Sequence, residues 1–311
     1  MTKKEYVKSA IQHKSTDSVP YLIDFCSDAW EAMKKALGEV PSTLYDNYVH
    51  GVGLPWWGWH QLGSDWHGSE TPKSKASVIG SGSYDGLADS IKAASDSTGK
   101  YMLVMIYGSH FEKAYFSRGI ENFLADMAAD PSFAKKLLTK IIDKNMVMLE
   151  NILTIQEIDG ILLGSDWGSQ RGLLMSPAVW DDMIAPGEHR EYDLIHSYGK
   201  DVWVHSCGCI DVIIPRLVEM GLDVLNPVQP ECMDIQNLKD SYGDKLSFWG
   251  GISTQDTLPY GTPDEVKKEA RRVRDIMAKN GGYILAPSQS LQGDVPVENI
   301  IALLEVANEQ V

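Results

Sequence analysis

A histidine and a cysteine two residues apart, His205 and Cys207, stand at the end of the apolar segment VWVHSCG. Residues at this spacing in an extended strand point to the same side of the strand. An imidazole and a thiolate placed in this way can bind one zinc ion. The same spacing also suits two half-buried polar residues that bind no metal, so both interpretations stand at this stage.

An aspartate, Asp166, ends another apolar segment within DGILLGSDW. Its carboxylate could act as a general base, orient a metal ligand or anchor a substrate, or it could be a cap or turn residue. His110, in YGSHFEK, could bind substrate or simply begin the next helix. We expect Asp166, His205 and Cys207 to be catalytic. The other residues near predicted strand ends that we expect to bind substrate are Asp24, Trp167, Asn226, Gln229 and Gln289.

The elements that must position these residues are short apolar segments alternating with helical patterns. The segments are 19–25, 76–80, 101–107, 159–167, 201–208, 223–228, 246–251 and 282–288. Their continuously apolar interiors are typical of parallel strands covered on both faces. We therefore predict an α/β protein with a (β/α)8 TIM-barrel fold, in one domain over residues 1–311, whose site lies at the carboxyl ends of the strands. An open doubly wound sheet is the alternative.

Several helices carry recognisable end signals. Thr2 and Glu5 have capping-box spacing at the start of an N-terminal helix. A helix over 263–280 has Thr262 as its N-cap and Gly281 just past its end, and another covers 296–309. The stretch 38–75 shows no clear barrel element and is rich in tryptophan. We interpret it as an excursion whose tryptophans, Trp56, Trp57, Trp59 and Trp66, mainly pack onto the barrel, although one or two could line a substrate pocket.

Composition narrows the class of function. The chain has 28 basic and 43 acidic residues, a formal net charge of −15. Such a surface repels phosphate backbones, so we expect no nucleic-acid partner. No apolar run reaches the roughly 20 residues of a membrane helix, and the N-terminus does not look like a secretory signal. The four unevenly spaced cysteines are not a disulfide framework, which favours a cytoplasmic protein with reduced thiols.

Five segments in series carry a family resemblance: GSDWGSQRGLLMSP, VWVHSCG, DVLNPVQP, FWGGISTQDTLPYGTPDEV and GGYILAPSQSLQGDVP. Together they resemble the uroporphyrinogen decarboxylase superfamily, closely over 159–309 and more loosely before that. The superfamily contains metal-free decarboxylases and zinc-dependent methyltransferases of corrinoid systems. The decarboxylases bind a polycarboxylate with arginines after the first strand, where this chain has the acidic YLIDFCSD. His205 and Cys207 match the zinc pair of the methyltransferase branch.

The resemblance also shows departures at the remaining zinc positions. The methyltransferases have a cysteine ligand in a motif like LAPGCG, and the matching LAPSQS places Gln289 there. Gln229 has the spacing of the glutamate ligand of cobalamin-independent methionine synthase. Neutral amides are poor zinc ligands. Cys209, Glu231 or Cys232 could substitute for them.

The resemblance therefore implies a methyltransferase of a corrinoid-dependent methyl-transfer or demethylation system. It implies a zinc cofactor, a partner protein that carries the corrinoid, and a small-molecule methyl donor or acceptor, either a thiol or a methoxy compound. Two alternatives stay open. One is a metal-free decarboxylase or lyase acting on a small acid, and the other is a barrel that binds a ligand without catalysis.

Overall fold

The structure of the chain is a computed structural model that describes residues 1–54, 86–106 and 108–309. Its described residues form two compact units. Unit 1 comprises Met1–His50, Gly99–Tyr101 and Asp223–Val311, and unit 2 comprises Gly51–Thr98 and Met102–Leu222. The predicted organisation as one domain stays a prediction. The predicted strand 76–80 and the four tryptophans of the 38–75 excursion lie outside the described residues.

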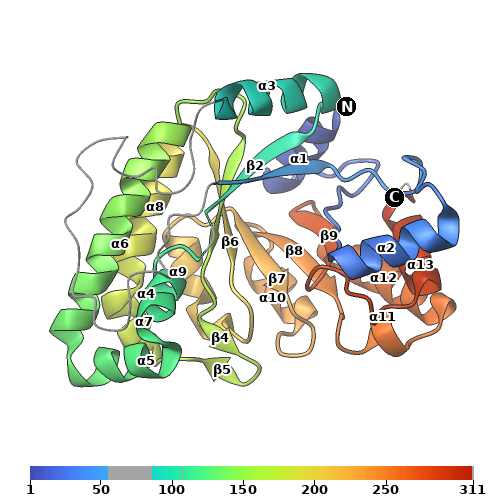
Figure 1. Ribbon diagram of the computed structural model, residues 1–311. Helices are drawn as coiled ribbons and strands as arrows, with labels where there is room; N and C mark the ends of the chain where they lie inside the picture. The colour runs from blue at the N-terminus through green and yellow to red at the C-terminus, as the bar shows by residue number, and fades with distance from the viewer. Residues whose placement is uncertain (55–85, 107, 310–311) are drawn as a thin grey trace. The chain divides into compact units, whose positions relative to one another are not determined.

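Helices and strands alternate along the chain, as the sequence predicts (Figure 1). The elements of unit 1 are α1 (Lys3–Ile11), α2 (Ser27–Leu37), β7 (Val224–Val228), α10 (Ile235–Tyr242), β8 (Ser247–Ile252), α11 (Thr257–Tyr260), α12 (Pro263–Met277), β9 (Tyr283–Pro287) and α13 (Val297–Ala307). Those of unit 2 are α3 (Leu87–Thr98), β2 (Tyr101–Ile106), α4 (Phe111–Arg118), α5 (Ile120–Ala129), α6 (Pro131–Ile152), β3 (Gly160–Gly164), β4 (Gly168–Ser169), β5 (Gly172–Leu173), α7 (Pro177–Met183), α8 (Ala185–Ser197), β6 (Asp201–His205) and α9 (Ile214–Glu219), with a 3₁₀ turn at Asp211–Ile213. The first residue of β2 belongs to unit 1, and β1 (Val49–Gly53) spans the division.

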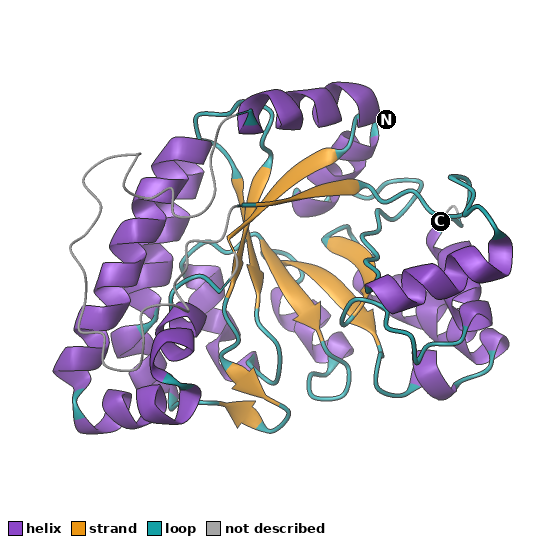
Figure 2. Cartoon of the chain, viewed as in Figure 1, coloured by secondary structure: helices purple, strands orange, loops and turns teal. Residues whose placement is uncertain are grey.

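The central strands of unit 2, β2, β3 and β6, run parallel (Figure 2). Gly160 pairs with Asp201 and Gly164 with His205, so β3 and β6 end at the same level. All five residues of β3 are buried, as are the three central residues of β6. On the helical side, α6 packs against α8 (Figure 1). Strands covered in this way need no polar alternation, which is why their sequences read as continuous apolar runs.

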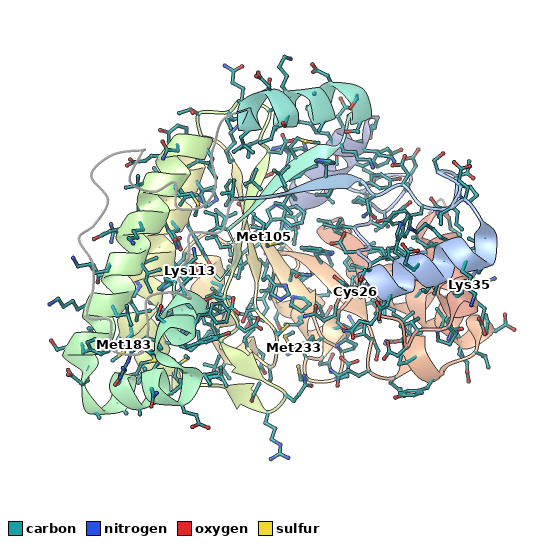
Figure 3. All side chains as sticks on the ribbon, viewed as in Figure 1. Cys26, Lys35, Met105, Lys113, Met183 and Met233 are labelled. Atoms are coloured by element: carbon teal, nitrogen blue, oxygen red, sulfur yellow. The ribbon has the colours of Figure 1, made fainter. Side chains whose placement is uncertain are left out.

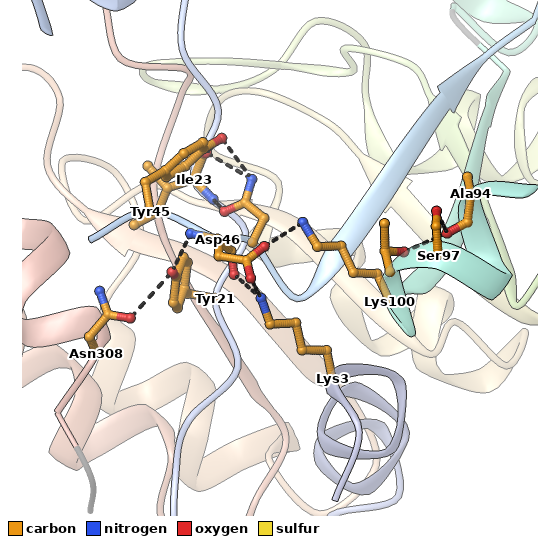
Figure 4. Close-up of polar contacts among 11 residues, drawn as sticks. Lys3, Tyr21, Ile23, Tyr45, Asp46, Ala94, Ser97, Lys100 and Asn308 are labelled. Atoms are coloured by element: carbon orange, nitrogen blue, oxygen red, sulfur yellow. Dashed lines mark hydrogen bonds and ion pairs between the residues drawn. The ribbon is translucent and has the colours of Figure 1, made fainter. Parts of the chain in front are cut away.

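Unit 1 has its own parallel strands, β7, β8 and β9. The predicted strand 19–25 is present only as two isolated bridges, Tyr21 to Leu285 and Phe25 to Leu291. Side chains complete its hydrogen bonding. The Asn47 side chain accepts from the Ile23 amide at 2.9 Å and donates to the Ile23 carbonyl at 3.0 Å (Figure 4).

An ionic cluster in unit 1 ties the N-terminal helix to the same region (Figure 4). Asp46 forms ion pairs with Lys3 and, at 2.7 Å, with Lys100. Partial burial opposes ionisation of Asp46, but hydrogen bonds and charges from Lys100 and Lys3 outweigh it and hold the pKa below its ordinary value. The carboxylate is therefore a structural anion rather than a proton donor near neutral pH.

The observed first residues of the helices agree with the sequence predictions better than their last residues do. Both capping boxes form, Thr2 with Glu5 and Thr262 with Glu265. The predicted helix 263–280 is shorter, since α12 ends at Met277 with Ala278 as its C-cap. Gly281, at φ +79°, follows in the turn after the helix. No helix of the described residues is long and apolar enough to cross a membrane.

Candidate functional site

Three predicted residues of unit 2 meet at the carboxyl ends of β3 and β6. The Sγ atom of Cys207 lies 3.4 Å from Nε2 of His205, and that nitrogen lies 3.7 Å from Oδ1 of Asp166. The same aspartate oxygen accepts a hydrogen bond of 2.8 Å from the Cys207 backbone amide. One donor atom from each residue lies within 4.8 Å of the others. The three side chains thus form a cluster in which imidazole, thiol and carboxylate face a common point.

The two chain segments that follow β3 and β6 are held together by backbone contacts. The Ser165 backbone amide donates to the His205 carbonyl at 2.9 Å, and the Cys209 backbone amide donates to the Ser169 carbonyl at 2.8 Å. The approach is so close that only glycine fits at two positions. A Cβ atom at Gly168 would lie 2.7 Å from the Cys207 carbonyl oxygen, and one at Gly208 would lie 2.5 Å from a Gly168 backbone atom. The glycines therefore allow Asp166 to approach His205 and Cys207.

The spacing of the donor atoms suits a zinc ion. With Zn–N near 2.05 Å and Zn–S near 2.3 Å, tetrahedral geometry separates nitrogen and sulfur by about 3.6 Å. The observed His205–Cys207 distance of 3.4 Å is close to this value. The three side chains are partly exposed, so their donors can complete three tetrahedral positions and leave the fourth to a substrate. The sequence did not indicate Asp166 as a metal ligand, because its approach depends on the pairing of β3 with β6.

A further acidic residue at this site, Glu112, was not predicted. It lies in the first turn of α4, is 6% exposed, and accepts a hydrogen bond of 2.8 Å from the Tyr115 hydroxyl. Burial, and then the negative charge of Asp166, raise the pKa of Glu112 to about 7. The sequence gives little signal for it, since a glutamate in a first helical turn is usually exposed and stabilises the helix dipole.

Other predicted residues of unit 2 lie in different surroundings. Trp167 is fully buried, and its ring stacks edge-on against Trp180 with centroids 5.4 Å apart. Cys209 donates its thiol hydrogen to Asp211 at 3.3 Å, and burial, followed by Asp211, raises its pKa. The structure therefore does not bring Cys209 into the cluster. His110 is fully buried at the N-cap of α4, 3.1 Å from Glu188.

Four predicted substrate-binding residues belong to unit 1. Asp24 is exposed, and Gln289 is half-buried. Asn226 is 5% exposed and donates to the Trp249 carbonyl at 3.1 Å, and Gln229 is 4% exposed. Their roles as substrate contacts, and those of Gln229 and Gln289 as metal ligands, stay predictions.

Comparisons with known proteins identify the family of the chain. The profile of the family described as uroporphyrinogen decarboxylase (URO-D) matches residues 67–310. Two curated relatives, both named methylcobamide:CoM methyltransferase MtaA, from Methanosarcina barkeri and from its strain Fusaro, are 27% and 30% identical over 142 residues. Each match covers 44% of this chain, which spans only 40% of either relative's length.

A solved structure gives the fold. A methyltransferase from Methanosarcina mazei superposes with a TM-score of 0.71 over 99% of this chain and 98% of its own, at 17% identity. At that identity the likeness shows the fold alone. It confirms the predicted α/β barrel fold class.

Proposed function

Because the chain belongs to the uroporphyrinogen decarboxylase family, we propose that it is a methyltransferase that binds zinc through His205 and Cys207. It acts in a corrinoid-dependent methyl-transfer or demethylation system. A separate protein carries the corrinoid, and a small thiol or methoxy compound accepts or donates the methyl group. The names of the two curated relatives, which are methylcobamide-dependent methyltransferases, support this assignment.

The observation that carries the proposal is the convergence of Asp166, His205 and Cys207. A zinc ion bound there would supply Lewis acidity, which lowers the pKa of a coordinated thiol or polarises a methoxy oxygen. His205 and Cys207 would hold this ion. Asp166, which accepts a hydrogen bond from the Cys207 amide, would either be a third ligand or orient the substrate.

Proton transfer falls to the residues beside this cluster. When an acceptor thiol becomes the nucleophile, its proton must leave the site. Glu112, whose pKa is raised to about 7 by burial and by Asp166, is partly ionised near neutral pH and can take up a proton. Demethylation of a methoxy compound needs the opposite transfer, which the protonated form of the same carboxyl can supply.

Metal analysis tests the proposal directly. Wild type should contain about one equivalent of zinc at this site, and His205→Ala and Cys207→Ala should each lose it. Cys209→Ser is the matched control, because the Cys209 thiol donates a hydrogen bond to Asp211 and should not contribute to zinc binding. Transfer of the methyl group from methylcobalamin to a small thiol should fall in parallel. Equal zinc content in wild type and both alanine variants would contradict the assignment.

Metal-free decarboxylation of a small acid is the alternative, favoured by the family's name. The half-exposed cluster of His205, Cys207 and Asp166 favours the methyltransferase, because metal-free decarboxylation does not require a thiol beside an imidazole. Exhaustive chelation separates the two functions. Carbon dioxide release from a carboxylic acid that persists without metal would support the decarboxylase.

A further inference from the structure

A second group of potential metal ligands lies buried in unit 2, behind the start of α4. Glu188 and Glu191 are three residues apart on α8, so both carboxylates lie on one face of the helix. His110 approaches them from the N-cap of α4. All three side chains are buried, and one donor atom from each lies within 4.8 Å of the others.

The carboxylate of Glu188 is the first sign that this cluster accepts a ligand. It is 0% exposed, and neither of its oxygens has a partner of good hydrogen-bond geometry in the described part of the chain, although the buried Tyr192 hydroxyl lies beside it. The imidazole Nδ1 of His110 is 3.1 Å from Oε1, but without hydrogen-bond geometry. An ionised carboxylate buried in this way is costly unless a cation or several donors compensate for it.

Glu191, in contrast, is held in a fixed orientation. The Asn145 side chain donates to its Oε1 and the Ser109 hydroxyl donates to its Oε2, both at 2.9 Å. Asn145 also donates to the Ser109 carbonyl at 3.0 Å. Hydrogen bonds of this kind orient the carboxylates of metal sites and leave their remaining lone pairs for the ion.

Further buried ionisable groups surround the cluster. Lys113 on α4, labelled in Figure 3, is buried and donates to Asn145 at 2.9 Å. Burial lowers the pKa of Lys113, and it raises that of Glu191, where the charge of Glu188 adds to the effect. Tyr192 is also buried beside Glu188, and burial followed by that charge raises its pKa well above the ordinary value. The tyrosine therefore stays neutral.

We propose that His110, Glu188 and Glu191 bind a divalent first-row transition-metal ion, distinct from the zinc of the proposed function. Ligands about 2.1 Å from a metal lie about 3.0 Å apart along an octahedral edge, close to the 3.1 Å between His110 and Glu188. One imidazole and two carboxylates, without a thiolate, suit manganese, iron, cobalt or zinc.

A pocket lies beside the cluster. His110 lines a pocket of about 180 Å³ whose rim carries Lys135 and Arg190. Coordination through Nδ1 leaves Nε2 on the pocket side, where it has no hydrogen-bond partner among the described residues. Gly187 lies close to this nitrogen, since a Cβ atom there would lie 2.9 Å from it.

Binding of Co²⁺ tests the second site without interference from the first. In a His205→Ala/Cys207→Ala variant, equilibrium dialysis should find about one equivalent of Co²⁺, with the visible absorption of a nitrogen–oxygen site and without thiolate charge-transfer bands. Adding Glu188→Gln or Glu191→Gln should weaken binding at least about tenfold. Glu150→Gln, an exposed change on α6, is the matched control.

Separate measurements distinguish a variant that does not fold from a proposal that is wrong. Circular dichroism shows whether each variant is folded, and Co²⁺ should raise the melting temperature of the Glu150→Gln control but not that of Glu188→Gln. If the His205→Ala/Cys207→Ala protein binds no Co²⁺, or if Glu188→Gln binds it as tightly as the control, the buried site is refuted. Either result leaves the zinc assignment standing, because that depends on the loss of metal in the single His205 and Cys207 variants.

Discussion

Glu112→Gln should stabilise the protein, and more so as the pH rises. The pKa of Glu112, about 7, exceeds the ordinary value of 4.5, first through burial and then through the charge of Asp166. The folded state therefore binds more protons than the unfolded state between these two values, and stability falls as the pH increases through that window. At 1.36 kcal/mol per pKa unit, the loss amounts to about 1 kcal/mol at pH 5.5 and about 3 kcal/mol above pH 7.

Urea unfolding of wild type and Glu112→Gln at pH 5.5 and pH 8 measures this effect. The variant's advantage in the free energy of unfolding should grow by about 2 kcal/mol between the two conditions. In an Asp166→Asn background this growth of the advantage should be smaller, because the substitution removes the second cause of the raised pKa of Glu112. The exposed Glu121→Gln on α5 is the control and should show no such pH dependence. A variant that gains nothing at pH 8 would refute the reasoning.

Two further substitutions test the packing that supports the site. Gly208→Ala should cost roughly 2–4 kcal/mol, since the residue has φ +89° and its Cβ would collide with Gly168. It should also lower zinc content, and unchanged stability in urea would contradict the close approach. Trp180→Ala should cost roughly 3–5 kcal/mol in the same assay, because it removes a fully buried ring from contact with Trp167. A loss below about 1 kcal/mol would mean that the ring is not packed as described.

Most strands could be located from sequence because their residues are apolar on both faces. β3, β7 and β9 are buried along their whole length, which agrees with the continuously apolar segments that predicted them. β1 was missed. Its sequence, VHGVG, contains two glycines and only two apolar residues, and its exposure alternates. The segment 19–25 reads as a regular strand, but side chains such as Asn47 replace part of its ladder, and no local pattern reveals such long-range bonds.

All three residues of the site could be selected from their places at predicted strand ends, but the sequence predicts a close approach only for neighbouring residues. His205 and Cys207 converge because they are two residues apart in an extended chain, and that needs no tertiary information. The approach of Asp166 depends on the pairing of Gly164 with His205 and on glycine at 168 and 208. Two glutamates on α8 look like ordinary surface residues, and only tertiary packing, including that of α6 against α8, buries them.

The two clusters of unit 2 differ in a way that assigns them different roles. At the strand ends, the His205 and Asp166 side chains are 29% and 36% exposed, so an ion bound there would be within reach of a substrate. At the start of α4, the His110 and Glu188 side chains are 0% and 1% exposed, and residues of α6 and of the segment before α4 hold Glu191 in place. Catalytic metal sites keep an open position, whereas structural sites are closed. The exposed cluster can therefore perform chemistry, and an ion in the buried one would instead fix α8 against α4, the helix that carries Glu112.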